Sequence, residues 1–211
     1  MIRIHDLHKS FGSQHVLRGI NLEIPTGTIY VVVGSSGTGK SCLLKHIIGL
    51  LRPDRGQVWV DDIEVSALRG RALNRMRDRF SMLFQGGALF DSLSVYDNVA
   101  FPLREKTRLS EAAISDKVHQ RLAQVGLSGV DAKFPSELSG GMLKRAALAR
   151  ALATDPEIML FDEPTTGLDP IRVSTIHQLI LDLHRLLNFT AVVVSHEIPE
   201  VFSLATHIAM L

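Results

Sequence analysis

Three stretches in the first third of the chain alternate apolar and polar residues with a period of about two. They are residues 1–8, 16–24 (VLRGINLEI) and 57–60 (QVWV). A strand with one buried face and one solvated face has this pattern, because successive side chains point to opposite sides of a sheet. The pattern predicts an antiparallel β layer in the N-terminal part of the chain.

Four further runs are nearly continuous in apolar residues, as expected of strands that are buried on both faces. The runs are TIYVVV (28–33), IMLF (158–161), TAVVVS (190–195) and HIAML (207–211). Strands of this kind belong to parallel sheets that are covered by helices. We therefore expect an α/β core with a mainly parallel sheet.

Two segments between the expected strands repeat apolar residues at helical spacing. The apolar faces consist of Leu43, Leu44, Ile47, Ile48 and Leu51 in one segment and Ile176, Leu179, Ile180, Leu183 and Leu187 in the other. Asp169 suits the N-cap of the second helix, and Pro170 suits its first position, where a missing N–H is tolerated. The second helix is thus predicted to begin at Pro170.

The region from about 86 to 155 is mainly helical in its pattern. It includes an amphipathic stretch from Ser110 to Val125, whose inward side is predicted to carry Ile114, Val118, Leu122 and Val125. We interpret the region 86–155 as a helical subdomain inserted into the α/β core. The core then consists of residues 1–85 and 156–211 of a single domain, 1–211.

Composition narrows the class of protein. The 211 residues are 45% hydrophobic, which is enough for a packed core, and the formal net charge of +1 gives no reason to expect nucleic acid or an anionic membrane surface as a partner. No stretch approaches the roughly 20 apolar residues that cross a bilayer, and the N-terminus lacks the apolar run of a signal peptide. The one cysteine, Cys42, cannot form an internal disulfide, in agreement with a reducing compartment.

A glycine-rich segment lies between the run 28–33 and the first helical pattern. It reads Gly34, Ser35, Ser36, Gly37, Thr38, Gly39, Lys40 and Ser41, which has the GxxxxGK[ST] form of a Walker A phosphate-binding loop. Glycines let backbone N–H groups converge on a phosphate, and the helix N-terminus adds its dipole. Lys40 is expected to reach the β- and γ-phosphate oxygens of a nucleotide, and Ser41 to bind Mg²⁺. The alternative, a simple glycine-rich turn, would not require the strand before it and the helix after it.

An acidic pair, Asp162 and Glu163, follows the apolar run 158–161. Asp162 is placed to hold the Mg²⁺ shell, and Glu163 to polarise an attacking water as the general base. A solvated turn that stops at Pro164 is the alternative interpretation. Together with the Walker A loop, the pair predicts nucleotide hydrolysis.

A second phosphate-binding device is predicted at the segment Leu138, Ser139, Gly140, Gly141 and Met142, which precedes the helical run KRAALARALA. Its backbone N–H groups and its hydroxyl would lie at a helix N-terminus. One nucleotide needs only one such loop. The second device is explained if it binds the γ-phosphate of ATP held by another copy, which implies a head-to-tail dimer with two ATP molecules between the copies.

The order of these motifs resembles that of the ABC ATPase family. The Walker A loop, Gln85, the LSGG segment, the acidic pair, the segment Gly167-Leu168-Asp169 and His196 follow one another as in that family, from the first strand almost to the C-terminus. The resemblance implies the ATP-hydrolysing subunit of a transporter, which dimerises around two Mg-ATP and drives a separate membrane permease.

The resemblance also implies roles for single residues. Phe11 matches the aromatic residue that stacks on adenine, with Val16 beside it. Gln85 matches a ligand of Mg²⁺ and water whose loop senses the membrane partner. Asp169 matches the residue that couples the two sites across the dimer, and His196 the switch histidine that contacts the γ-phosphate. The other eight histidines are expected to have no such role and to face solvent.

Two positions depart from the family pattern. Met142 stands where glutamine is usual, which leaves the expected contacts of Ser139 and Gly141 intact. Cys42 stands where threonine or serine is common in the first helix, next to Ser41, and is expected to be a small packing residue beside the nucleotide.

The stretch from Leu83 to Leu103 resembles the ATPases of the Mla type (maintenance of lipid asymmetry) in particular. That resemblance implies phospholipid or other lipid transport, with a permease and a lipid-binding protein of the mammalian-cell-entry (MCE) class, at the cytoplasmic face of the inner membrane. The permease would dock in a small apolar groove after Gln85, formed by Gly86, Gly87, Ala88, Leu89 and Phe90. The family normally continues beyond the last strand, 207–211, so a truncated C-terminus is expected.

Other functions fit the sequence less well. The ATPase of a polar-solute importer or of a lipoprotein-release system has much of the same sequence in this stretch, and it is the alternative within the ABC family. A soluble ABC protein acting on ribosomes or DNA would be expected to have tandem domains, a long coiled coil or basic arms. A P-loop kinase or GTPase would leave the LSGG segment and His196 unexplained.

Overall fold

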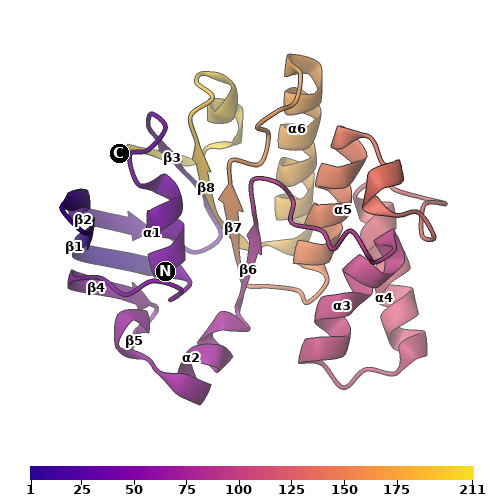
Figure 1. Ribbon diagram of the computed structural model, residues 1–211, viewed down its shortest axis with the longest axis horizontal. Helices are drawn as coiled ribbons and strands as arrows, with labels where there is room; N and C mark the ends of the chain where they lie inside the picture. Colours follow the sequence, from indigo (N-terminus) through magenta and orange to yellow (C-terminus); the bar gives the residue numbers. More distant parts are fainter.

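The computed structural model describes residues 1–211 and contains two β-sheets with helices packed around them (Figure 1). The first sheet is antiparallel and contains β2 (Gln14–Ile24), β1 (Ile2–Phe11), β4 (Arg55–Val60) and β5 (Ile63–Glu64), in that order. Ile2 and Ile4 of β1 pair with Val60 and Val58 of β4, and all four side chains are buried. The predicted antiparallel layer is confirmed.

The second sheet is parallel and contains β6 (Phe80–Leu83), β7 (Ile158–Asp162), β8 (Thr190–Ser195), β3 (Ile29–Val33) and β9 (His207–Met210), in that order. Every residue of β3, β7 and β8 is buried. Val31 packs into one hydrophobic cluster and Val32 into another, because neighbouring side chains face opposite sides of the sheet. The continuous apolar runs thus have the physical cause that was inferred for them.

The strand β9 departs from the prediction of burial on both faces. Ile208 is 49% exposed and Met210 81% exposed. The strand lies at the edge of the sheet, where it pairs only with β3. The apolar pattern predicts the strand correctly, but its prediction of burial on both faces is wrong.

The parallel sheet separates two hydrophobic clusters. On one face, α1 (Lys40–Ile47) packs between the parallel sheet and the antiparallel sheet, and the cluster includes Leu43, Leu44 and Ile47. On the other face lie α3 (Val95–Lys106), α4 (Glu111–Gln124), α5 (Gly140–Leu152) and α6 (Pro170–Leu187). Figure 1 shows α3, α4 and α5 gathered on the side opposite the antiparallel sheet. The remaining elements are η1 (Val65–Ala67), α2 (Gly70–Arg77), η2 (Pro135–Glu137) and η3 (Glu200–Leu204).

The predicted helices are largely confirmed. α6 begins at Pro170, and the Asp169 side chain accepts a hydrogen bond from the Arg172 N–H as its N-cap. The inward side of α4 and its C-cap is buried as predicted, at Ile114, Val118, Leu122 and Val125. α1 is shorter than its apolar pattern, since it ends at Ile47. None of the helices has the length and apolar character that would let it span a bilayer.

Two histidines contradict the expectation of solvent exposure. His46 is 1% exposed and His177 is 3% exposed, and burial lowers the pKa of both. Nδ1 of His46 forms a hydrogen bond with the Cys42 carbonyl oxygen, 2.7 Å away in the same helix. An imidazole that stays neutral can be buried at a modest free-energy penalty if it has such a partner.

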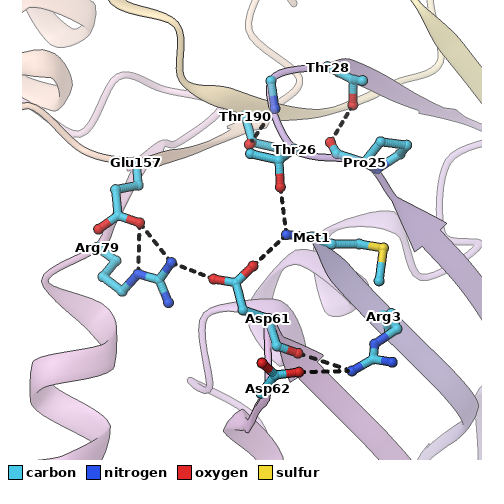
Figure 2. A network of polar contacts seen from close by, with 11 residues as sticks. Met1, Arg3, Pro25, Thr26, Thr28, Asp61, Asp62, Arg79, Glu157 and Thr190 are labelled. Atoms are coloured by element: carbon cyan, nitrogen blue, oxygen red, sulfur yellow. Dashed lines mark hydrogen bonds and ion pairs between the residues drawn. The ribbon is translucent and has the colours of Figure 1, made fainter.

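A polar network joins the two sheets at the ends of their strands (Figure 2). The N-terminal ammonium of Met1 contacts Thr26 at 2.7 Å and Asp61 at 2.6 Å, and Arg79 donates to Asp61 and to Glu157. The Met1 ammonium and then the Arg79 guanidinium lower the pKa of the Asp61 carboxyl. Arg79 therefore connects the turn between β4 and β5 to the start of β7.

Replacing Arg79 with methionine is expected to lower the Tm at pH 7 by about 2–4 °C, since partly exposed ion pairs contribute about 1 kcal/mol in total. The pKa of Asp61 is lowered in the folded state, so its stabilising contribution is present above the unfolded pKa and is lost as the pH falls through the folded pKa. Thermal melts of wild type and variant should therefore converge only at a pH below the lowered, folded-state pKa of Asp61. Arg71→Met, at an exposed position of α2, is the control; a gap in Tm that persists at low pH would contradict this account.

Candidate functional site

The glycine-rich segment links β3 to α1, as its motif predicts. Gly37 and Gly39 have φ angles of 85° and 101°, in the left-handed region that favours glycine. A Cβ on Gly39 would lie 2.8 Å from Val16 Cγ1, so the loop needs a glycine there for space as well as for conformation. Thr38 closes the loop by donating its hydroxyl to the Ser35 carbonyl oxygen at 3.0 Å.

Lys40 is almost completely buried at the first position of α1. Its ammonium donates to the carbonyl oxygens of Gly34 at 2.7 Å and Ser35 at 2.9 Å, and it lies 3.5 Å from Glu163 Oε1. A buried ammonium is stable only with such partners. The charge is thereby held over the loop, where the loop's backbone N–H groups would bind a phosphate.

Ser41 and Asp162 meet across the site. The Ser41 hydroxyl donates to Asp162 Oδ1 at 2.7 Å, and Asp162 is buried at the end of β7. The two residues are far apart in the chain and come together because α1 packs against β7 and β8. The contact places a hydroxyl and a carboxylate oxygen side by side, as the sequence predicts.

Glu163 is the most constrained residue of the site. It is 8% exposed and has a φ of 50°, a left-handed conformation that is unusual for a residue with a side chain. Its Oε2 lies 2.7 Å from His196 Nδ1, and its Oε1 faces Lys40. A carboxylate only accepts hydrogen bonds, so Nδ1 of His196 carries the proton and Nε2 is left for another partner.

Lys40, Ser41, Glu163 and His196 line one cleft of about 250 Å³, and Asp162 lies behind Ser41, outside the lining. Its lining consists of Ser36, Gly37, Gly39, Lys40, Ser41, Cys42, Gln85, Glu163 and His196. The strand ends of β3, β6, β7 and β8 contribute to it, as is common where parallel strands end next to helix N-termini. Burial raises the pKa of the Cys42 thiol, which agrees with a packing role.

The LSGG segment lies at a separate place. The Ser139 side chain caps α5 by accepting a hydrogen bond from the Met142 N–H. A second hollow, of about 230 Å³, is lined by Ser139 and Gly141 together with Arg145 and Arg172. Neither Ser139 nor Gly141 contributes to the cleft around Lys40. Gly140 is exposed at the same helix start. One chain therefore carries two distinct sites with exposed backbone at a helix N-terminus.

Phe11, Val16 and Asp169 lie outside the cleft lining. Phe11 is 51% exposed at the end of β1, and Lys9 Nζ lies 5.5 Å from its ring centroid. Val16 packs against Gly39, so it supports the phosphate-binding loop. Asp169 is half-exposed and pairs with Arg172 at 3.1 Å.

The segment after Gln85 is only partly the apolar surface that was expected. Gly87 is buried and Leu89 packs against the core, whereas Phe90 is 43% exposed and packs edge-on against Phe101. A separate groove of about 470 Å³ lies beside Phe84, between α2, β6 and the end of α3. Its lining includes Phe84, which is 40% exposed, together with charged side chains.

Cations surround these sites that the sequence pattern does not predict. Arg145 and Arg172 face the hollow at Ser139, and the buried Lys144 donates a hydrogen bond to the Gln85 carbonyl oxygen. A signal for Lys144 was present, because its position falls on the apolar face of α5 with Ala147, Leu148 and Ala151. No pattern indicated which segment it would contact.

Comparison with known proteins agrees with this geometry. The family model described as "ABC transporter" matches residues 17–166, and a shorter match over 132–203 is to an AAA domain described as "putative AbiEii toxin, Type IV TA system". Among solved structures, cbiO1 of Clostridium perfringens, part of an ABC transporter complex, superposes with a TM-score of 0.91 at 30% identity over 99% of this chain and 83% of that one. A dimeric ATP-binding cassette described as a post-hydrolysis state bound to ADP and Pi superposes with a TM-score of 0.90 at 32% identity, over 100% and 94%.

Curated relatives include the probable ribonucleotide transport ATP-binding protein mkl of Mycobacterium tuberculosis, 47% identical over 100% of this chain. The chain spans 58% of the length of that relative. The intermembrane phospholipid transport system ATP-binding protein MlaF of Escherichia coli is 44% identical over 98% of this chain and 77% of its own length. The MlaF of Haemophilus influenzae is 46% identical over 98% and 78%. The chain belongs to the ABC transporter family.

Proposed function

We propose that the chain binds and hydrolyses Mg-ATP as the nucleotide-binding domain of an ABC transporter, with residues 1–85 and 156–211 as the α/β core and 86–155 as the helical subdomain. The observation that carries the proposal is the position of Glu163. Its carboxylate is held between Lys40 and His196 at a cleft lined by a phosphate-binding loop. That arrangement provides a phosphate site, a base and a group that orients the base in one place.

The chain's own residues account for the steps of hydrolysis. When nucleotide binds, the Lys40 ammonium would give up its hydrogen bonds to the carbonyl oxygens of the loop and donate to phosphate oxygens instead. The oxygen of the attacking water bonds to the γ-phosphorus while Glu163 accepts one of its protons. The bond between the γ-phosphorus and the bridging oxygen breaks, which yields ADP and phosphate. His196 holds Glu163 through Nδ1 and has Nε2 available for the γ-phosphate.

Magnesium fits the oxygen donors that the structure brings together. Mg²⁺ prefers oxygen ligands and is commonly held by one or two protein groups plus phosphates and water. The Ser41 hydroxyl and the Asp162 carboxylate, 2.7 Å apart, would hold it, with the Gln85 amide at the same cleft. When bound, Mg²⁺ would neutralise charge on the phosphate oxygens.

A head-to-tail dimer is the assembly that would use both helix N-terminal sites. The hollow at Ser139 and Gly141 is open and lies apart from the cleft at Lys40. In the dimer each hollow would face the γ-phosphate of the ATP on the other copy, with Arg145 and Arg172 adding positive charge nearby and Asp169 at the junction. The dimeric cassette among the similar structures supports this assembly.

The proposed cargo is phospholipid or another lipid. Support comes from the MlaF relatives, which are named for intermembrane phospholipid transport. In this proposal the chain lies at the cytoplasmic face of the inner membrane and binds a permease near Gln85, where Phe84 and Phe90 are exposed. An MCE-type lipid-binding protein would join through the permease. The name of the mkl relatives favours a second candidate cargo, ribonucleotides.

Purification of the native complex from membranes tests the proposal. Mg-ATP hydrolysis that stops on chelation of Mg²⁺, a hydrophobic permease that copurifies, and phospholipid in the organic extract are the expected results. A protein that does not hydrolyse ATP contradicts the enzymatic part. Hydrolysis that is stimulated by a polar solute or a ribonucleotide, and that is indifferent to lipid, contradicts only the cargo.

A further inference from the structure

Lys144 carries a buried charge that the steps of hydrolysis above do not use. It lies in α5, five residues after the N-cap Ser139, and is only 9% exposed. Burial lowers the pKa of its ammonium, and Glu197 partly offsets that effect by attracting the charge from beyond ion-pair distance. Burying an ammonium without a carboxylate partner is unfavourable, so this side chain lowers the stability of α5 compared with an apolar one.

The hydrogen-bond partner of Lys144 is the backbone of the docking segment, defined here as residues 85–90. The ammonium donates to the carbonyl oxygen of Gln85. Because the contact is to the backbone, the Gln85 side chain is left to line the cleft with Lys40 and Glu163. The position of the Gln85 amide therefore depends on where α5 lies.

A second cation of α5 holds the same segment. Arg150 donates through Nη2 to the Gly87 carbonyl oxygen at 2.8 Å, and its guanidinium lies 5.6 Å from the centroid of the Phe90 ring. Gly87 also packs on α5, since a Cβ added to it would lie 3.1 Å from Ala147 Cβ. The docking segment and α5 are thus joined at three points along nearly two turns of helix.

We propose that Lys144 is a positioning residue for ATP hydrolysis, which places the Gln85 amide in the nucleotide cleft and ties its position to the helix that begins at Ser139. The assignment rests on the proposed function. A shift of α5 on closure of the dimer, or of the docking segment on contact with a permease, is passed to the other element through the bond between Lys144 and Gln85. The buried charge then contributes geometric specificity rather than stability.

Lys144→Met tests this assignment, because methionine has a similar length and is apolar but cannot donate. The expected result is a fall in kcat of about ten- to a hundredfold, the range for a displaced positioning group, with ATP affinity and Tm not lowered. Lys144→Arg keeps a charged hydrogen-bond donor, so its kcat should fall less than that of Lys144→Met. Lys133→Met, at an exposed lysine, is the matched control and should behave as wild type.

A double variant separates positioning from general disruption. If Lys144 acts through Gln85, then adding Lys144→Met to Gln85→Ala should lower kcat no further than Gln85→Ala alone. Amide hydrogen exchange in residues 85–90 should also be faster in Lys144→Met than in Lys133→Met, without any nucleotide present. This second measurement does not depend on hydrolysis.

The outcomes can be told apart. Wild-type hydrolysis that Lys144→Met leaves unchanged, or effects of the two substitutions that multiply, would overturn the assignment of Lys144 alone. Equal losses of Tm in Lys144→Met and Lys144→Arg would mean that Lys144 serves the stability of the fold, and would overturn its assignment as a positioning residue. A wild-type protein that fails to hydrolyse Mg-ATP would overturn the proposed function and the assignment together.

Discussion

Glu163→Gln is expected to reduce the rate of ATP hydrolysis by about 10²- to 10⁴-fold while ATP still binds, the usual range for loss of a general base. Glutamine has nearly the same shape as glutamate. Its amide oxygen can still accept from His196 Nδ1, which lies 2.7 Å from Oε2 in the wild type, so the side chain should keep its place. What is lost is the ability to take a proton from water.

Single-turnover measurements with radiolabelled ATP would isolate this step. The matched control is Glu105→Gln, at an exposed position near the end of α3, which should hydrolyse ATP at the wild-type rate. A dimer that persists in Mg-ATP only in Glu163→Gln would agree with a block after ATP binding. Near-normal hydrolysis by Glu163→Gln would remove this residue from the role of base.

Lys40→Ala is expected to weaken ATP binding by about a hundredfold. Hydrogen bonds to charged groups contribute roughly 1.5–3 kcal/mol each, and Lys40 is placed to form more than one with the phosphates. The substitution also removes the bonds that Lys40 makes to the Gly34 and Ser35 carbonyl oxygens, so the loop loses part of its support before nucleotide arrives.

Titration calorimetry with ADP, which avoids turnover, measures this effect. Lys45→Ala, five residues along the same helix and exposed, is the control for a lost lysine in α1. Equal affinities in Lys40→Ala and the wild type would mean that Lys40 does not contact the phosphates. A fall in Tm without nucleotide would measure the separate effect on the loop.

The fold was predictable where one physical cause dominates the pattern. β3, β7 and β8 are apolar throughout because both of their faces are covered. The end of α1 was missed because the apolar face runs on to Leu51, although Gly49, with a φ of 72°, marks the stop of the helix. The exposure of β9 depends on its neighbours in space, which periodicity does not contain.

The site was predictable where its chemistry lies in short segments. The glycine-rich loop and the acidic pair each combine an element end with the residues that are proposed to act, so local spacing is enough to predict them. The contacts between segments were not predictable in this way. The bond from Lys144 to Gln85 joins residues 59 positions apart, and the burial of His177 depends on packing that forms only in the folded chain.

The order of strands in the parallel sheet has a mechanical consequence for the cleft. Lys40, Glu163 and His196 follow β3, β7 and β8, each of which has a strand on both sides, whereas Gln85 follows β6, which pairs only with β7 through four residues. Displacing an inner strand would break two ladders, and displacing the end of β6 would break one. Three sides of the cleft are therefore anchored on both flanks of their strands, whereas the side formed by β6 is easier to displace. That side continues into residues 85–90, where a permease is proposed to bind.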